Sequence, residues 1–344
     1  MDLDGLATPA LVVDADALDA NLTVMAARLP GRRLRPHVKA HKCTALAARQ
    51  VEHGHDTFTC ATPREMVGMA AIGRDLLLAN EVLDIGRLRA VAEAGERHGV
   101  TMTVAVDSPE TVRAAAAGGI GSVVVDVNVG LPRCGVAPEE AGRIADAARA
   151  AGLTVRGVMG YEGHLQMVAD VAERAEQVAA AMRLLRRAHD LVGGDLVSAG
   201  GTGTHDLHVL DLDDPAGVTE VQAGSYALMD SQYSTLDQGF AQALTVLGTV
   251  VSVTPGTDRR GWAVADVGLK ALGMDHGDPT IEGARVWFCS DEHITFSCDP
   301  LPSVGDRVRV VPAHVDPTMA RHRDLWLVRG SSVVDRWAID LRHW

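Results

Sequence analysis

Residues 34–42 read Leu34-Arg35-Pro36-His37-Val38-Lys39-Ala40-His41-Lys42. The spacing of the apolar residues predicts a strand from Leu34 to Val38, and the odd positions of this extended stretch share one face. Those odd positions are all basic: Arg35, His37, Lys39 and His41. Because buried parallel strands are normally apolar on both faces, a basic face must line a polar cavity or meet solvent.

Lys39 is the candidate for chemistry in this stretch. A lysine beside other cations loses its proton more easily, because the charged form is disfavoured, and a neutral amine can attack a carbonyl carbon. The spacing alone fits a basic edge strand or a turn equally well. Pro36 is also unusual inside a parallel strand, so it would have to lie at the start of the strand or at a bulge.

Two segments resemble a known enzyme family. Residues 8–14, Thr8-Pro9-Ala10-Leu11-Val12-Val13-Asp14, resemble the beginning of the alanine-racemase-type (fold type III) pyridoxal-phosphate enzymes. Within that family, residues 35–42 resemble the branch of the D-threonine aldolases and D-serine dehydratases. The resemblance runs in patches over nearly the whole chain. It implies that Lys39 binds the cofactor pyridoxal 5'-phosphate covalently.

Short β-type segments alternate with alanine-rich helical segments up to about residue 238. The expected strands are 34–38, 57–60, 76–79, 102–106, 123–127, 155–159, 196–198 and 220–222. Eight strands that alternate with helices predict an α/β fold, the (β/α)8 TIM barrel, like the N-terminal domain of alanine racemases. A further strand at 11–13 is left over, and we expect it to pair elsewhere.

The pattern changes near residue 240, where helical periodicity becomes weak. Short β-rich segments separated by Gly, Pro and Asp turns predict an antiparallel β domain. We therefore predict a pyridoxal-phosphate-binding barrel at 12–238 and a C-terminal β domain at 239–344, joined by residues 1–11, that carries metal ligands. Enzymes of the resembling family are usually dimers, which implies a homodimer here.

Composition and charge exclude several classes of protein. The chain has 344 residues and a net charge of −13, which argues against a nucleic-acid partner because such partners require a basic stripe. The sequence contains no apolar run of about 20 residues, so no membrane partner is expected. The acidic N-terminus has no signal-peptide core, and the five scattered cysteines favour a reducing compartment. We expect a cytoplasmic protein.

Two glycine-rich loops predict a phosphate site. Gly200-Gly201-Thr202-Gly203-Thr204 follows the seventh expected strand, and Ala223-Gly224-Ser225-Tyr226 follows the eighth. TIM barrels often bind phosphate with these two loops, because glycines let backbone N–H groups approach the anion. A single loop of this kind is more often only a tight turn. In the resembling family the two loops bind the cofactor phosphate, which implies roles for Gly201, Thr202, Gly203, Thr204, Gly224 and Ser225.

Other expected strand ends carry further candidates. Arg133 resembles the arginine of the family's Arg-x-Gly element, which faces the phenolic oxygen of the cofactor. Gln222 stands where alanine racemases have an arginine that pairs with the pyridine nitrogen. A glutamine carries no charge and cannot pair with this nitrogen as an arginine does. Either another group such as Tyr161 contacts the nitrogen, or the reaction needs less stabilisation of the carbanion. Gln222 therefore disfavours a racemase. His164 is either a general base or a hydrogen-bonded structural histidine.

His314 and Asp316 form the candidate metal site. At positions i and i+2 they project to one side of an extended chain, and an imidazole with a carboxylate suits Mn, Mg or Zn. The local sequence alone favours a helix N-cap at Asp316 followed by Pro317 at the first helical position. The resemblance implies the metal, since His-x-Asp looks like the aldolases and His-x-Cys like the zinc-dependent dehydratases. Manganese is the first expectation.

These residues predict a lyase of D-amino acid metabolism. The expected reaction is the cleavage of D-threonine-like β-hydroxy-α-amino acids to glycine and an aldehyde, with Lys39 and His164 as catalytic residues. One alternative is a D-serine or 3-hydroxyaspartate dehydratase of the same family. Another is a non-catalytic pyridoxal-phosphate-binding carrier, although such carriers usually lack a second domain.

Overall fold

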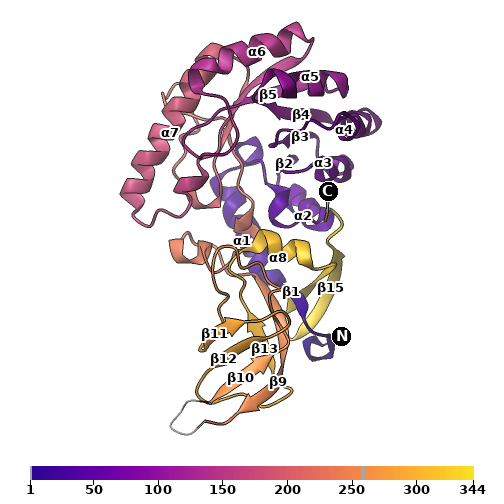
Figure 1. The fold of residues 1–344 in the computed structure, drawn as a ribbon, viewed down its shortest axis with the longest axis vertical. Coiled ribbons are helices and arrows are strands. Elements are labelled where there is room, and N and C mark those ends of the chain that lie inside the picture. Colours follow the sequence, from indigo (N-terminus) through magenta and orange to yellow (C-terminus); the bar gives the residue numbers. More distant parts are fainter. Residues whose placement is uncertain (1, 257–260) are drawn as a thin grey trace. The chain divides into compact units, whose positions relative to one another are not determined.

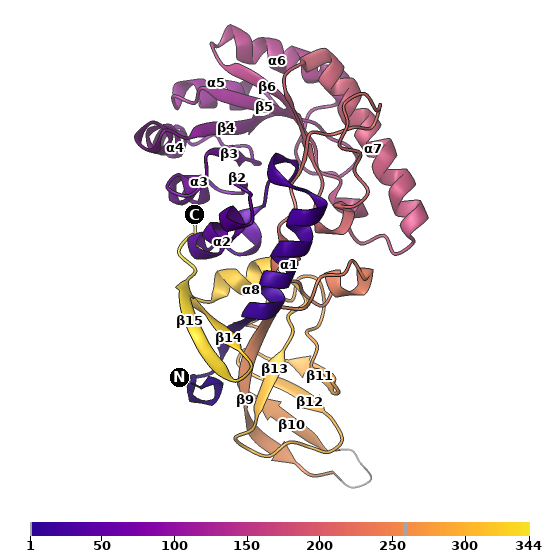
Figure 2. The same ribbon diagram turned by 180° about the vertical axis from the view of Figure 1, so that it is seen from behind.

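The computed structural model describes residues 2–256 and 261–344. The chain forms two compact units, which Figures 1 and 2 show from opposite sides. Unit 1 comprises Met1–Val24, Ala40–Ala45 and Ser225–Asp340, and unit 2 comprises Met25–Lys39, Leu46–Gly224 and Leu341–Trp344. The domain bounds expected from the sequence stay a prediction. No helix in the described ranges has the length and apolar character needed to cross a membrane.

Unit 2 is organised around a curled parallel sheet. In the described part of the chain it has seven strands in sequence order: β2 (Thr57–Cys60), β3 (Asp75–Leu78), β4 (Thr101–Val106), β5 (Ser122–Asp126), β6 (Thr154–Met159), β7 (Leu196–Ala199) and β8 (Glu220–Val221). These strands confirm seven of the expected barrel strands, each bound lying within one residue of its prediction. Buried valine, leucine and alanine side chains fill most of the core.

Helices follow the strands and cover the outer face of this sheet (Figure 1). They are α2 (Thr44–Glu52), α3 (Pro63–Met69), α4 (Ile85–His98), α5 (Pro109–Ala117), α6 (Ala141–Ala150) and α7 (Val171–Val192), while α1 (Ala15–Arg28) precedes them. Several begin at strong caps. The Thr62 side chain accepts a hydrogen bond from the N–H of Glu65 ahead of α3, and proline occupies the first turn. The alternation of strand and helix thus confirms the predicted fold class.

The first expected barrel strand is the exception. Leu34 and His37 form only isolated bridges, to Val221 of β8 and to Thr59 of β2. Val38–Ala40 is a 3-10 turn, so the prediction of a regular strand from 34 to 38 was wrong. The segment nevertheless hydrogen-bonds both edge strands of the sheet.

Pro36 explains this irregular pairing. Proline has no N–H to donate, so the ladder cannot be regular at this residue, although its carbonyl accepts a hydrogen bond from Thr59 N–H at 2.9 Å. The predicted basic face is also wrong beyond His37, because Lys39 lies in the 3-10 turn and not on an extended chain. Arg35 points into the sheet and is buried.

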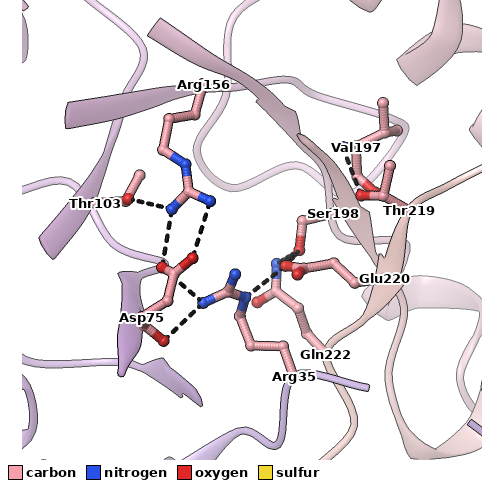
Figure 3. A network of polar contacts seen from close by, with 9 residues as sticks. All are labelled: Arg35, Asp75, Thr103, Arg156, Val197, Ser198, Thr219, Glu220 and Gln222. Carbon is pink, nitrogen blue, oxygen red and sulfur yellow. Dashed lines mark hydrogen bonds and ion pairs between the residues drawn. The ribbon is translucent and has the colours of Figure 1, made fainter. Parts of the chain in front are cut away.

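A buried ion network lies inside the curled sheet (Figure 3). Arg35 Nε lies 2.6 Å from Glu220 Oε1, and Arg35 Nη1 lies 3.2 Å from Asp75 Oδ1. Arg156 donates to both oxygens of Asp75, at 2.8 and 2.9 Å, and Thr103 accepts from Arg156 as well. Burial opposes ionisation of Asp75, but Arg156 and Arg35 outweigh it and lower the pKa of this carboxyl.

We expect Asp75→Asn to lower the free energy of unfolding by about 3 kcal/mol, because it leaves the buried Arg35 and the partly buried Arg156 with one counter-charge fewer. Urea unfolding followed by circular dichroism measures this. Since the folded-state pKa lies below the unfolded one, the stabilisation is present at neutral pH and is lost as the pH falls through the folded-state pKa. Glu110→Gln, which removes an exposed ion pair with Arg113, is the control and should change little. Equal effects of the two variants would contradict the prediction.

Unit 1 contains a mainly antiparallel sheet. In the described ranges its eight strands are β1 (Ala10–Asp14), β9 (Leu244–Thr254), β10 (Trp262–Ala265), β11 (Arg285–Cys289), β12 (Ile294–Ser297), β13 (Arg307–Val310), β14 (Asp324–Arg329) and β15 (Ser332–Ala338). β1 pairs with β9 and β14, which confirms that the leftover strand belongs to another sheet. The edge strand β15 was not expected from the sequence, and the helix α8 (Val315–Arg321) was expected only as the alternative to a metal site, with its start placed at Asp316.

Candidate active site

Lys39 lies just beyond the bridge between His37 and Thr59 of β2, at the carboxyl end of that strand. Active residues of TIM barrels lie at this end of the strands. The half-buried Lys39 places its Nζ 6.0 Å from the centroid of the Tyr161 ring, and Arg133 Cζ lies 5.3 Å from the same centroid. The structure therefore brings together three of the predicted cofactor residues, which follow the segment at 34–37, β5 and β6.

A small cavity lies beside Arg133 and Tyr161, and Asp126 and Cys134 line it as well. Burial and the neighbouring Glu81 raise the pKa of the Asp126 carboxyl. Burial, with a further contribution from Glu81, raises the pKa of the Cys134 thiol to about 12, so this cysteine remains a thiol at neutral pH. These groups were not predicted from the sequence, because their proximity depends on the order of the strands.

Gln222 lies directly after β8 and belongs to the interior network (Figure 3). Its Nε2 donates to Ser198 Oγ at 2.8 Å, and Ser198 Oγ donates to Glu220 Oε1 at 2.7 Å. His164 lies in the 3-10 turn Gly163–Leu165 and is exposed, with its ring against the backbone of Gly130. The structure thus gives Gln222 a fixed partner and leaves His164 accessible, as a general base requires.

The glycines of the first loop, at 200–204, are required by packing against Gln166, which the sequence did not predict. A Cβ on Gly201 would lie 2.5 Å from Gln166 Oε1, and one on Gly203 would lie 2.1 Å from the Gln166 carbonyl oxygen. The N–H of Gly203 donates to Gln166 Oε1 at 2.8 Å, and the N–H of Gly201 donates to Thr204 Oγ1 at 3.3 Å. Close packing on Gln166 therefore requires these glycines, whether or not phosphate binds.

The phosphate role of this loop stays a prediction. Thr202, Gly203 and Thr204 are buried and form a 3-10 turn. In the second loop Gly224 is buried, and Ser225 begins the 3-10 turn Ser225–Ala227. In the first loop the amides of Gly201 and Gly203 and the Thr204 hydroxyl already donate within the protein. A phosphate would therefore be bound by other backbone amides of the two turns and by the Ser225 hydroxyl, which are donors of the kind that binds phosphate.

Glu162, which lies between the predicted residues Tyr161 and His164, was not predicted from the sequence. Its side chain is fully buried, at 0% exposure, and contacts Gly200, Thr204 and His208. A glutamate in a loop gives no local sequence signal that its side chain is buried. A carboxylate of this kind needs hydrogen-bond donors around it, because burying an unpaired charge is costly.

The predicted metal residues lie in unit 1, at the start of α8. His314 is the N-cap residue of this helix and Asp316 lies in its first turn. Two expectations were therefore wrong: the chain is not extended across this pair, and Asp316 is not the cap. His314 Nε2 nevertheless lies 3.8 Å from Asp316 Oδ1. Asp230 fixes the start of the helix by accepting a hydrogen bond from Val315 N–H at 3.0 Å.

The other side of the His314 ring is occupied by protein. Nδ1 lies 2.7 Å from Asp275 Oδ2, and the ring of His276 stacks on His314 with centroids 3.8 Å apart. Burial opposes ionisation of Asp275, but the contact with His314 outweighs it and lowers the pKa of this carboxyl. Histidines that bind metals commonly make such a second contact, which fixes their tautomer.

Two ligand sets are possible here. Asp275, His276 and His314 present ligand atoms within 4.8 Å of one another. A metal between Asp275 and His314, however, would have to replace their hydrogen bond. The pair of His314 Nε2 and Asp316 keeps that bond and offers one nitrogen and one carboxylate, so it fits a divalent ion better.

Comparisons with known proteins show the family of this chain. Residues 13–232 match the family described as alanine racemase, N-terminal domain, and residues 243–328 match the putative serine dehydratase domain. The chain belongs to the alanine racemase-like family. This confirms the predicted family of pyridoxal-phosphate enzymes.

Relatives within the alanine racemase-like family are named for related reactions. The chain is 34% identical to a D-threonine aldolase from Arthrobacter sp, covering 97% of this chain and 92% of that one. The crystal structure of D-threonine aldolase from Filomicrobium marinum has a TM-score of 0.89 and 34% identity, covering 99% of this chain and 97% of that one. A D-threo-3-hydroxyaspartate dehydratase from Delftia sp. (strain HT23) is 32% identical but covers only 79% of this chain and 74% of that one. The aldolases are therefore the better match.

Proposed function

We propose that this chain is a pyridoxal-phosphate- and divalent-metal-dependent aldolase that cleaves D-configured β-hydroxy-α-amino acids to glycine and an aldehyde. The observation that carries this proposal is the pair of His314 and Asp316, with Asp275 on the opposite ring nitrogen. A racemase or a carrier has no use for such a pair. The similarity to D-threonine aldolases over nearly the whole chain supports the same reaction.

Pyridoxal phosphate, when bound, supplies an electron sink for the negative charge that develops on Cα. Lys39 would bind the cofactor, and Arg133 would face its phenolic oxygen. The two loops with Gly201, Thr202, Gly203, Thr204, Gly224 and Ser225 would bind its phosphate. Tyr161 lies against both cations and would keep them at their positions beside the cofactor.

His314 and Asp316 would hold the metal ion, which lowers the pKa of a hydroxyl or water beside it. We propose manganese, with magnesium or zinc as the other candidates, because the ligands are one imidazole and one carboxylate. His164 is exposed and is the candidate to accept the proton of the β-hydroxyl. As that proton leaves, the Cα–Cβ bond breaks, its electron pair stays on Cα, and protonation of Cα gives glycine.

The dehydratase alternative uses the same residues in a different way. Lys39 would remove the proton from Cα, and the metal would stabilise hydroxide as the leaving group. Asp316 argues against this alternative, because the zinc-dependent dehydratases that the chain resembles have cysteine at this position. We further propose a homodimer that works in the cytoplasm on small amino acids and has neither nucleic-acid nor membrane partners.

Product analysis from D-threonine, with and without a chelator, tests the proposal. We expect glycine and acetaldehyde in equal amounts, and their loss when the metal is removed. Formation of 2-oxobutanoate and ammonia would instead establish the dehydratase. Bound cofactor without any product would indicate the carrier.

A further inference from the structure

We infer that Glu162 and His208 are positioning residues that hold the glycine loop at 200–204 in the shape that the cofactor phosphate requires. The inference rests on the proposed function, because it assumes that this loop binds pyridoxal phosphate. It concerns two residues that neither the resemblance nor the phosphate motif assigns. Both residues and the loop belong to unit 2.

Glu162 contacts both ends of the loop with one carboxylate. Its Oε2 accepts a hydrogen bond from the N–H of Gly200 at 3.2 Å, and its Oε1 accepts one from Thr204 Oγ1 at 2.6 Å. The loop between these two residues is therefore closed over a buried, charged acceptor. Hydrogen bonds to charged groups are stronger than those between neutral groups, so this contact determines the loop shape more than its other contacts do.

Two further donors complete the surroundings of the carboxylate. His208 Nε2 lies 3.1 Å from Glu162 Oε1, and Gln166 Nε2 lies 3.3 Å from the same oxygen. The side chains of Glu162 and His208 are both fully buried, at 0% exposure. Burial opposes ionisation of Glu162, but His208 and the hydrogen bond from Thr204 outweigh it and lower the pKa of this carboxyl.

The direction of each hydrogen bond in the loop follows from this acceptor. Because the Thr204 hydroxyl donates to Glu162, its lone pairs are directed to other donors, and it accepts from Gly201 N–H at 3.3 Å and from Gln166 Nε2 at 3.0 Å. A carboxylate accepts only, whereas an amide also donates. An amide at position 162 would place an NH2 group against Gly200 N–H or against Thr204, His208 and Gln166.

The loop has little freedom to adapt to such a change. A Cβ on Gly200 would lie 2.7 Å from His208 Nε2, and one on Gly203 would lie 2.1 Å from the Gln166 carbonyl oxygen. The loop is thus packed against His208 on one side and Gln166 on the other. A donor that displaces one end of the loop must therefore move the turn between Gly200 and Thr204 as well.

Glu162 also follows Tyr161 directly in the chain. The ring of Tyr161 lies against Lys39 and Arg133, at the end of the site where the cofactor ring is expected. One dipeptide after β6 therefore serves both ends of the proposed cofactor site. Glu162 sets the position of the loop at 200–204 relative to Tyr161. This role explains why a carboxylate is buried directly after Tyr161.

The test compares pyridoxal 5'-phosphate with pyridoxal, which has no phosphate. Titration of the cofactor-free protein with each compound, followed by absorbance, gives two dissociation constants. In the full-length wild type the phosphate compound should bind much more tightly. We expect Glu162→Gln to raise the dissociation constant of pyridoxal phosphate by about tenfold or more, which is the effect of losing hydrogen bonds to a charged group. The dissociation constant of pyridoxal should stay nearly unchanged.

His208→Ala provides a second variant in case Glu162→Gln does not fold. We expect it to change the ratio of the two dissociation constants, pyridoxal to pyridoxal phosphate, in the same direction but by less. Asp75→Asn is the matched control: it removes a buried carboxylate with several donors at the amino end of β3 (Figure 3), and it should lower stability without changing the ratio. A wild-type ratio in both Glu162→Gln and His208→Ala overturns the inference alone. Failure of the wild type to bind pyridoxal phosphate overturns the proposed function itself.

Discussion

Lys39→Ala should lose turnover of D-threonine to background while the protein folds normally. The half-buried Nζ lies at a strand end beside Tyr161, and no other lysine is predicted to bind the cofactor. The variant should also lack the visible absorption of a lysine-bound cofactor. In the wild type, borohydride reduction followed by peptide mapping should find the cofactor on Lys39. Circular dichroism should show an unchanged fold.

Two other lysines serve as controls for this assignment. Lys42 lies three residues further on, with a positive φ of 49°, and Lys270 is exposed and paired with Glu292. Lys42→Ala and Lys270→Ala should keep the cofactor band. A borohydride label on either of these lysines in place of Lys39 would refute the assignment, and with it the order of residues in the proposed site.

Most of the barrel strands were predictable because they are short, largely apolar runs between the end of one helix and the cap of the next. Their bounds follow from local chemistry, such as Thr62 and Pro63 at the start of α3. The segment at 34–38 was not predictable as an irregular strand, since its alternation looks extended and only Pro36 signals otherwise. Its hydrogen bonds go to Val221 and Thr59, which are far away in the sequence.

In the candidate site, too, local sequence patterns could be predicted and long-range contacts could not. Arg133 and Tyr161 could be placed near one another because each follows a strand, and parallel strands bring their carboxyl ends to one edge. Lys39 follows the irregular segment at 34–37 at the same edge. Glu162 and His208 are 46 residues apart, and no local pattern links them. The start of α8 was placed two residues too late, because its N-cap, His314, makes no side-chain capping bond, whereas Asp316 and Pro317 look like a cap and a first turn. Long-range contacts and weak caps thus required the structure.

Removal of the metal should abolish cleavage of D-threonine yet leave the cofactor bound. The cofactor acts on charge at Cα, whereas the metal acts on the β-oxygen, so the two losses are separable. Asp316→Ala should therefore keep the cofactor band and the exchange of the α-protons of glycine, which has no β-oxygen. Activity on D-threonine should fall to background. Chelator treatment of the wild type followed by addition of Mn²⁺ should restore it.

Two substitutions of Asp316 separate a ligand from a structural residue. Asp316→Cys should keep a metal but shift the preference towards zinc, since a thiolate is a softer ligand. Asp316→Asn keeps the size of the side chain but loses the charge, and a first-turn carboxylate contributes only modestly to a helix. The exposed Asp278→Asn, in the same unit, should leave metal affinity unchanged. Full activity of Asp316→Asn in thoroughly chelated buffer would refute the metal site, and it would leave the structure without a reason to prefer cleavage at the β-carbon over a reaction that needs no metal.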